Sequence, residues 1–125
     1  MAGQAGLDET VTLRIFNHNI YEYRRGVRCL FLMTMGAQEL PNILTRLEET
    51  EIDHFVQEVN SVKVNLFFGR AAFVDTTRSI VTKPLCQLTP EEDFMLGTLL
   101  GYDREQQCVR YLTRCARAPL CGTCH

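Results

Sequence analysis

The chain has 125 residues, a formal net charge of −2 at pH 7, 46% hydrophobic residues and 22% charged residues. These values are typical of one ordinary globular domain, and the weak negative charge argues against broad binding of nucleic acid. No apolar run approaches the ~20 residues that span a bilayer, and residues 1–9 lack the features of a signal peptide. We therefore expect a cytoplasmic protein with its cysteines as thiols, and a mobile tail over residues 1–9.

The first half of the chain is predicted to contain two strands and one helix. Residues 10–15 alternate between polar and apolar, which predicts a strand, and the polar, aromatic and basic segment 17–27 is expected to form a loop. Residues 28–35 are almost continuously apolar, as in a strand that is covered on both faces. Apolar residues between 40 and 47 have the spacing of an amphipathic helix, with Pro41 in its first turn.

The middle of the chain predicts a hairpin, a second helix and a further strand. Residues 53–59 and 62–68 are the predicted strands of the hairpin, and Asn60 suits the turn because asparagine tolerates positive φ. Gly69 opens the second predicted helix, in which one face is shared by Phe73, Val74, Thr77 and Ile80. A short strand is predicted within residues 81–87, where a proline would confine it to an edge or an end.

Residues 89–112 predict a helical hairpin. Thr89 and Glu92 have capping-box spacing, which marks the start of the first helix. Gly101 suits a left-handed turn at the end of that helix, and Asp103 suits the cap of the next one. The first helix is apolar nearly all round, so we expect it to be buried. The second carries an apolar stripe at helical spacing, formed by Cys108, Val109, Leu112 and Cys115.

From Arg28 onward the predicted order is β-α-β-β-α-β. This is the ferredoxin-like order, an antiparallel sheet with two helices on one face, and it implies no iron–sulfur cluster. The predicted fold class is therefore α+β, with an extra N-terminal strand and a C-terminal helical hairpin. We expect one domain over residues 10–115, followed by a cysteine-containing tail over residues 116–125. Such folds host unrelated functions, so the fold alone does not identify one.

Three blocks of sequence carry a family resemblance. They are residues 18–28, residues 65–69 and residues 89–111, of which the last block is the most specific. Over roughly residues 14–112 the chain resembles the DUF2023 family of small bacterial proteins of unknown function. The resemblance implies a compact soluble protein encoded near flavodoxin genes, and so an association with electron-transfer proteins. It implies no catalytic residue, and the segment 113–125 departs from the family pattern.

The segment around Tyr21 is the predicted partner-binding site. Its residues are His18, Tyr21, Glu22, Arg24, Arg25 and Arg28. Arginine can hold a carboxylate or phosphate by two parallel hydrogen bonds, and the arginines have the right sign for docking a typically acidic flavodoxin. The alternative is structural: the tyrosines pack against the sheet, while the arginines face solvent or pair with Glu22.

The remaining candidate groups are weaker. Cys115, Cys121, Cys124 and His125 have the ligand count of a zinc site, although Cys124 and His125 are neighbours and share one ion awkwardly. A thiol–disulfide role and a tail without any site are the alternatives, and the C-x-x-C-H string of c-type haem attachment has no export signal beside it. The acidic run 91–93 is explained by the start of a helix. Cys29, Cys86 and Cys108 are expected to be small core residues.

No assembled catalytic constellation is visible in the sequence, and we expect no cofactor. The leading hypothesis is a non-enzymatic interaction module whose partner is a flavodoxin or a second copy of the chain, with no nucleic acid or membrane as partner. One alternative is a regulatory domain that binds a small molecule between the sheet and the Tyr21 segment. The other is a thiol or metal protein that acts through its C-terminal cysteines.

Overall fold

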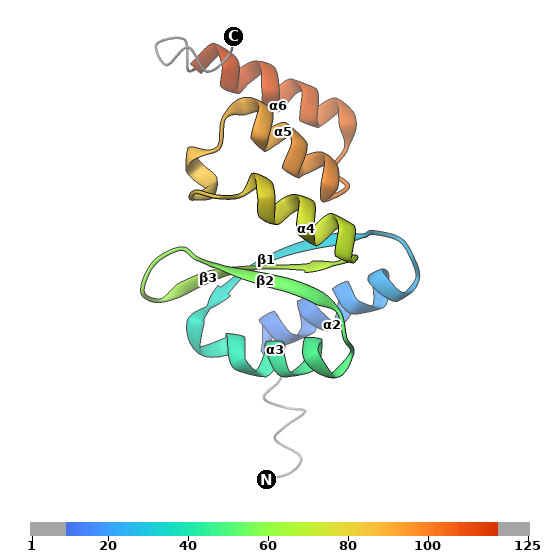
Figure 1. Cartoon of the computed structure of the whole chain (residues 1–125). Coiled ribbons are helices and arrows are strands. Elements are labelled where there is room, and N and C mark those ends of the chain that lie inside the picture. Colours follow the sequence, from blue (N-terminus) through green and yellow to red (C-terminus); the bar gives the residue numbers. More distant parts are fainter. Residues whose placement is uncertain (1–9, 118–125) are drawn as a thin grey trace.

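The structure, a computed structural model, describes residues 10–117. Helices cover both faces of a three-stranded antiparallel sheet, with α2 and α3 on one face, α4 on the other, and α5 and α6 stacked beyond α4 (Figure 1). In chain order the elements are α2 (Val11–Arg24), β1 (Leu30–Gly36), the 3₁₀ helix η1 (Ala37–Glu39), α3 (Leu40–Glu49), β2 (Asp53–Glu58), β3 (Lys63–Gly69), α4 (Ala71–Ile80), the 3₁₀ helix η2 (Leu85–Gln87), α5 (Pro90–Leu99) and α6 (Arg104–Arg117).

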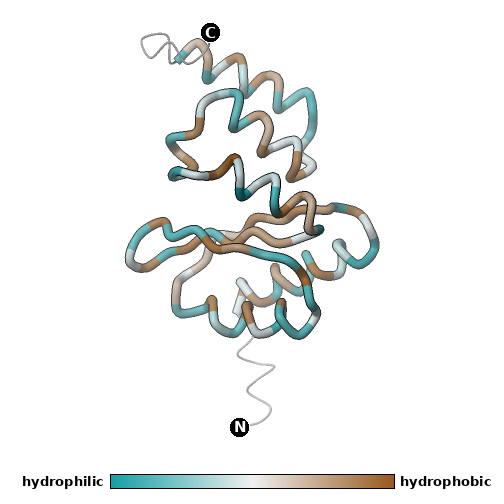
Figure 2. The backbone as a smooth tube through the Cα atoms, viewed as in Figure 1, coloured by the Kyte–Doolittle hydropathy of each residue, from teal (hydrophilic) through white to brown (hydrophobic). Residues whose placement is uncertain are grey.

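Strand β3 lies at the centre of the sheet, in the order β1-β3-β2. Its residue Phe67 lies opposite Leu32 on β1 and Phe55 on β2, and both pairings are antiparallel. Because side chains alternate along each strand, this register gives the sheet two apolar faces. The hydrophobic segments of β1 and β3 therefore lie between helical layers, as Figure 2 shows.

Each face of the sheet has its own core. The first core is built by α2, β1, α3 and β3, and it consists of Phe16, Phe31, Met33, Met35, Ile43, Leu47, Ile52, Val64, Leu66 and Phe68. The second core is built by β1, β3, α4, α5 and the segments between them, and it consists of Leu30, Phe67, Val74, Val81, Leu88, Leu96 and Leu100. The prediction that residues 28–35 form a strand covered on both faces is thus confirmed.

The β2–β3 hairpin is confirmed, but Asn60 acts through its side chain. Its Oδ1 accepts hydrogen bonds from the backbone N–H groups of Val62 and Lys63, both at 2.9 Å. Among the described residues other than glycine, only Glu51 has a positive φ. The asparagine therefore shapes this turn as a local hydrogen-bond acceptor, a role that its short side chain performs well.

The predicted ferredoxin-like fold is wrong, and the first error is at the N-terminus. Residues 11–24 form the helix α2, where a strand and a loop were expected. The Oγ1 of Thr10 caps this helix by accepting a hydrogen bond from the N–H of Leu13 at 3.0 Å. The inward side of α2 is formed by Leu13, Phe16, Ile20 and Tyr23, which have helical spacing and pack on the first core.

The second error is the strand predicted within residues 81–87, which contains η2 and no strand. Side chains attach this segment to the sheet: the amide of Gln57 donates to the carbonyl oxygen of Lys83 at 2.8 Å. Gln57 in turn accepts a hydrogen bond from Asn65, at 3.1 Å. Pro84 has no N–H to give to a ladder, and the segment that contains it forms a turn and adds no fourth strand.

The predicted helical hairpin exists as α5 and α6. The capping box is complete, since the Oγ1 of Thr89 accepts from the N–H of Glu92 at 3.1 Å and the Oε1 of Glu92 accepts from the N–H of Thr89 at 2.9 Å. Gly101 follows with φ 81°, and the Oδ2 of Asp103 accepts from the N–H of Gln106 at 3.0 Å. The first helix is not buried all round, because Met95 is exposed.

The apolar stripe of α6 largely faces solvent. Val109 is 58% exposed and Leu112 is 65% exposed, while the buried residue of this helix is Gln107. The prediction that three cysteines are core residues is wrong for Cys86 and Cys108, because both are exposed. Cys29 is half-buried. The contact between α5 and α6 is made mainly by polar and aromatic groups.

Candidate functional site

Helix α2 presents a mixed cationic and apolar stripe to solvent. Arg14, His18, Tyr21 and Arg25 are all exposed and follow one another at helical spacing. The guanidinium carbon of Arg25 lies 5.4 Å from the centre of the Tyr21 ring, a cation–π contact. Val11 and Ile15 are also exposed and extend the same face toward the start of the helix.

Two of the predicted partner-binding residues stabilise the fold. The carboxylate of Glu22 lies 3.1 Å from His18 Nε2 and 3.7 Å from Arg28 Nη1. Arg28 also donates from Nε to the carbonyl oxygen of Leu100 at 3.3 Å, and its guanidinium carbon lies 4.5 Å from the centre of the Phe31 ring. Arg28 therefore connects α2 on one face of the sheet with the end of α5 on the other.

Arg24 points to a different side of α2. With Arg46 and Glu49 it lines a small cavity of about 180 Å³ between α2 and α3. The tyrosines also separate: Tyr23 packs on the first core, with its ring centre 6.5 Å from that of Phe31, whereas Tyr21 is 58% exposed. The residues of the predicted site therefore divide into two sets. His18, Tyr21 and Arg25 lie on the solvent-facing stripe, whereas Glu22 and Arg28 make contacts within the fold.

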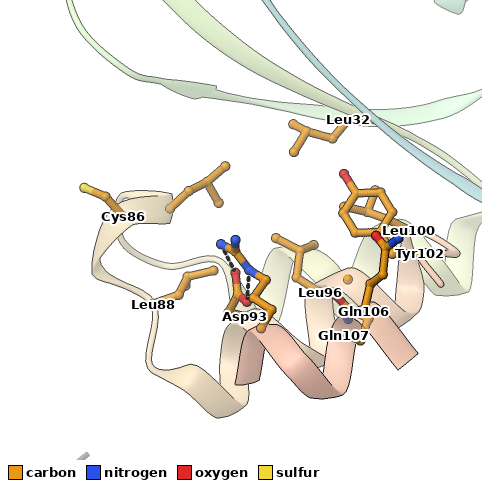
Figure 3. Close-up of a pocket in the computed structure, with 12 residues that line it drawn as sticks. Leu32, Cys86, Leu88, Asp93, Leu96, Leu100, Tyr102, Gln106 and Gln107 are labelled. Atoms are coloured by element: carbon orange, nitrogen blue, oxygen red, sulfur yellow. Dashed lines mark hydrogen bonds and ion pairs between the residues drawn. The ribbon is translucent and has the colours of Figure 1, made fainter. Parts of the chain in front are cut away.

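A larger cavity, of about 680 Å³, lies on the other face of the sheet. It is lined by residues of β1, η2, α5 and α6 and the segments that join them, and it opens to solvent, with Leu32 of the strand above the two helices (Figure 3). Its lining consists of Leu32, Leu85, Cys86, Leu88, Asp93, Leu96, Gly97, Leu100, Tyr102, Gln106, Gln107 and Arg110. Sequence reasoning placed a ligand pocket beside Tyr21 and missed this cavity, because Leu32 on β1 lies far along the chain from η2, α5 and α6, which form the rest of the lining.

One ion-pair cluster borders this cavity. The carboxylate of Asp93 accepts two hydrogen bonds from Arg110, from Nε at 2.6 Å and from Nη2 at 3.1 Å, and it lies 3.2 Å from Nη1 of Arg114. The hydrogen bond with Asp93 raises the pKa of Arg110, which therefore stays charged. Two guanidinium groups thus face one carboxylate.

The acidic run 91–93 has a separate partner for each carboxylate. Glu91 accepts from the hydroxyl of Tyr111 at 3.0 Å, Glu92 belongs to the capping box and pairs with Lys83 at 3.1 Å, and Asp93 pairs with arginines. The hydrogen bond from the backbone of Thr89, together with Lys83, lowers the pKa of Glu92. This confirms the prediction that these acids belong to a helix start.

The cysteine and histidine candidates do not converge within residues 10–117. No group of three His, Cys, Asp or Glu side chains in this range is placed to hold a metal ion. Cys115 is half-buried on α6, and Cys121, Cys124 and His125 lie outside the described residues. His54 lies on β2, with its Nδ1 2.9 Å from the carbonyl oxygen of Ile52, and His18 pairs with Glu22 on α2.

Tyr111 has the most perturbed phenol of the described residues. Hydrogen bonds with the side chains of Cys115 and Glu91 raise the pKa of Tyr111 to about 12. Both partners favour the neutral phenol, since its hydroxyl donates to the carboxylate of Glu91 and ionisation would place two negative charges together. This arrangement holds α5 and α6 together and makes the phenol a poor general base.

These features define a class: a small α+β protein with a solvent-facing helical stripe that carries arginines on one side of its sheet and a cavity on the other. No helix in the described part of the chain is both long and apolar enough to cross a membrane. Residues 14–114 match a protein-family model described as a protein of unknown function, DUF2023, so the chain belongs to the DUF2023 family. No curated protein matches the chain significantly.

Proposed function

We propose that this protein is a non-enzymatic docking module that binds an acidic protein surface through the exposed stripe of α2. The observation that carries the proposal is the concentration of positive charge on this element. The stripe itself carries two arginines, Arg14 and Arg25, and no acidic residue, whereas the whole chain has a net charge of −2. An oppositely charged surface is attracted to such a patch, which raises the rate of association.

The composition of the stripe supports a binding role. Tyrosine and arginine are the residues most enriched at the energetic centres of protein interfaces, together with tryptophan. Here Tyr21 and Arg25 are in contact before any partner arrives, so part of the side-chain ordering cost is already met. Val11 and Ile15 supply apolar surface beside the charges.

A flavodoxin is the first partner to test, because the family resemblance associates this chain with electron-transfer proteins and flavodoxins are typically acidic. In this proposal the protein contributes a docking surface and no redox group. A cytoplasmic location follows from such a partnership. A second copy of the chain is the other partner considered, with the two outer strands of the sheet as its route of pairing.

The experiment is a titration of the full chain with a flavodoxin at low and at moderate salt. The double variant Arg14→Ala/Arg25→Ala should weaken binding by roughly tenfold, a loss of about 1.4 kcal/mol, and should flatten its salt dependence. Arg78→Ala is the matched control, since Arg78 is an exposed arginine on α4, across the sheet from α2.

Equal binding by the wild type and the double variant would contradict the proposal. Sedimentation of the chain alone at the same two salt concentrations tests the second-copy alternative. A dimer that persists in the double variant would place self-association away from the α2 stripe.

A further inference from the structure

The cavity between β1, η2, α5 and α6 has the dimensions of a ligand site. Its volume of about 680 Å³ falls within the roughly 300–1,000 Å³ of small-molecule pockets. Leucines from three different parts of the fold form the wall: Leu32 on β1, Leu88 after η2, and Leu96 on α5 with Leu100 directly after it (Figure 3). This wall suits the apolar body of a ligand.

The polar groups of the cavity come mainly from α6 and the turn before it. Tyr102 points its hydroxyl toward the sheet, and Gln106 lies beside it, at the end of the cavity away from Cys86 (Figure 3). Arg110 also lines the cavity, and its two bonds to Asp93 use two of its five N–H donors. A further oxygen can therefore bind the same guanidinium.

The charges on the rim favour an anion. Asp93 is the one carboxylate among the lining residues, and it is held by both Arg110 and Arg114, so the cluster has an excess of one positive charge. A cationic ligand would meet a carboxylate that is already neutralised. A polyphosphate would leave most of the leucine wall without an apolar partner.

We propose that this cavity binds an amphipathic carboxylic acid. Its hydrocarbon body lies on the leucine wall, its carboxylate accepts hydrogen bonds from Arg110, and Gln106 and Tyr102 supply further donors. Charge-assisted bonds of this kind are stronger than neutral ones, and a carboxylate matches the planar geometry of arginine. The site lies across the sheet from the α2 stripe, so it stands independently of the docking proposal.

The test uses three probes with the same eight-carbon chain: octanoate, octan-1-ol and octylammonium. Each is titrated into the full chain while backbone amide shifts and the melting temperature are recorded. Octanoate should shift amides of β1, η2, α5 and α6 and raise the melting temperature, octan-1-ol should bind about tenfold more weakly, and octylammonium should not bind at this site. Equal binding of all three probes would overturn the assignment of a carboxylate.

Variants locate the site. Arg110→Gln should weaken octanoate binding about tenfold, equivalent to about 1.4 kcal/mol, and leave octan-1-ol binding unchanged. Leu32→Trp should fill the cavity and abolish binding of both probes, and Gln106→Trp, at an exposed position, serves the same purpose if Leu32→Trp does not fold. Arg78→Gln is the control for loss of an ion-paired arginine outside the cavity. Octanoate binding that survives both tryptophan variants, or no binding by the wild type, would refute the site.

Discussion

Gly97 on α5 leaves room for the side chain of Gln107 on α6. Gln107 is only 4% exposed, and its amide donates to the carbonyl oxygen of Phe94 at 3.0 Å. A Cβ atom at position 97 would overlap the side-chain amide of Gln107. The two helices therefore approach through a glycine and a buried amide, and this contact forms one wall of the cavity.

Gly97→Ala should lower the free energy of unfolding by about 1–3 kcal/mol, because the methyl group displaces a buried and hydrogen-bonded side chain. Denaturant unfolding measures this loss. Thr98→Ala, at the adjacent exposed position of α5, should change stability by no more than ~0.5 kcal/mol and controls for helix propensity.

A double-mutant cycle tests the mechanism. Gln107→Ala removes the group with which the new methyl clashes, so Gly97→Ala should cost less in that background than in the wild type. Purely additive losses would show that the contact between these two positions is not the cause.

The titration of Tyr111 gives a second prediction at this scale. Its pKa, about 12 in the folded chain, is higher than the usual 10.0, so the folded state favours the protonated phenol. The associated stabilisation is complete below pH 10.0 and is lost as the pH rises through about 12. An absorbance titration of the four tyrosines should show one late transition, absent in Tyr111→Phe and retained in Tyr102→Phe. Glu91→Gln should move that transition to lower pH, because it removes the carboxylate that accepts from the Tyr111 hydroxyl. A transition that does not move would show that this hydrogen bond is not a cause of the raised pKa.

At the level of single residues, sequence patterns revealed local chemistry better than long-range contacts. The capping roles of Thr89 and Asp103 depend on neighbours three residues away, and both were predicted correctly. The sequence also drew attention to the arginines near α2. It did not reveal that Arg14 and Arg25 lie on the exposed stripe, whereas Arg28 makes contacts within the fold. The roles of Gln107 and Arg28 depend on partners 13 and 72 residues away, which no local pattern encodes.

At the level of elements, the capping box should control the stability of α5. Thr89→Ala removes the hydroxyl that accepts from the N–H of Glu92, and such losses cost about 1 kcal/mol. Thermal or denaturant unfolding measures the change. Thr98→Ala again serves as control, because its hydroxyl bonds only within the helix. An unchanged stability in Thr89→Ala would show that water replaces the cap at no cost.

The solvent-facing stripe of α6 predicts a small effect from changes that would be severe in a core. Leu112→Ser and Val109→Ser should each change the free energy of unfolding by no more than ~0.5 kcal/mol, because both side chains are more than half exposed. Leu96→Ser, in the second core, is the positive control and should cost several times more. A large loss in Leu112→Ser would mean that this face is covered in solution.

The elements that were predicted wrongly share a physical reason. In α2, Val11 and Ile15 lie on the solvent side while Leu13 packs on the first core, so the three apolar residues whose alternation suggested a strand do not share one face. In segment 81–87, apolar residues fill the second core from an irregular chain, which resembles a strand in composition alone. The strands β1 and β3 and the helix α3 were predicted correctly because the apolar residues that form their sequence patterns are the residues that they bury in the cores.

At the scale of the whole molecule, Arg28 joins the two helical layers. Arg28→Met keeps much of the contact with Phe31 but removes the bonds to Glu22 and to the carbonyl oxygen of Leu100. Hydrogen exchange should then accelerate at the ends of both α2 and α5, by about fivefold for a loss of about 1 kcal/mol. Arg25→Met, at an exposed position, is the control. Acceleration confined to α2 would contradict a link between the layers.

The two cores also become complete at different times during synthesis. The first core draws on residues between Phe16 and Phe68, whereas the second requires residues as late as Leu100. On the ribosome, all three strands therefore emerge while Leu30 and Phe67 still lack the helices that cover them. Translation of the remaining thirty or so residues takes seconds. During that interval the nascent chain exposes an apolar sheet face, which makes it a more aggregation-prone species than the finished protein.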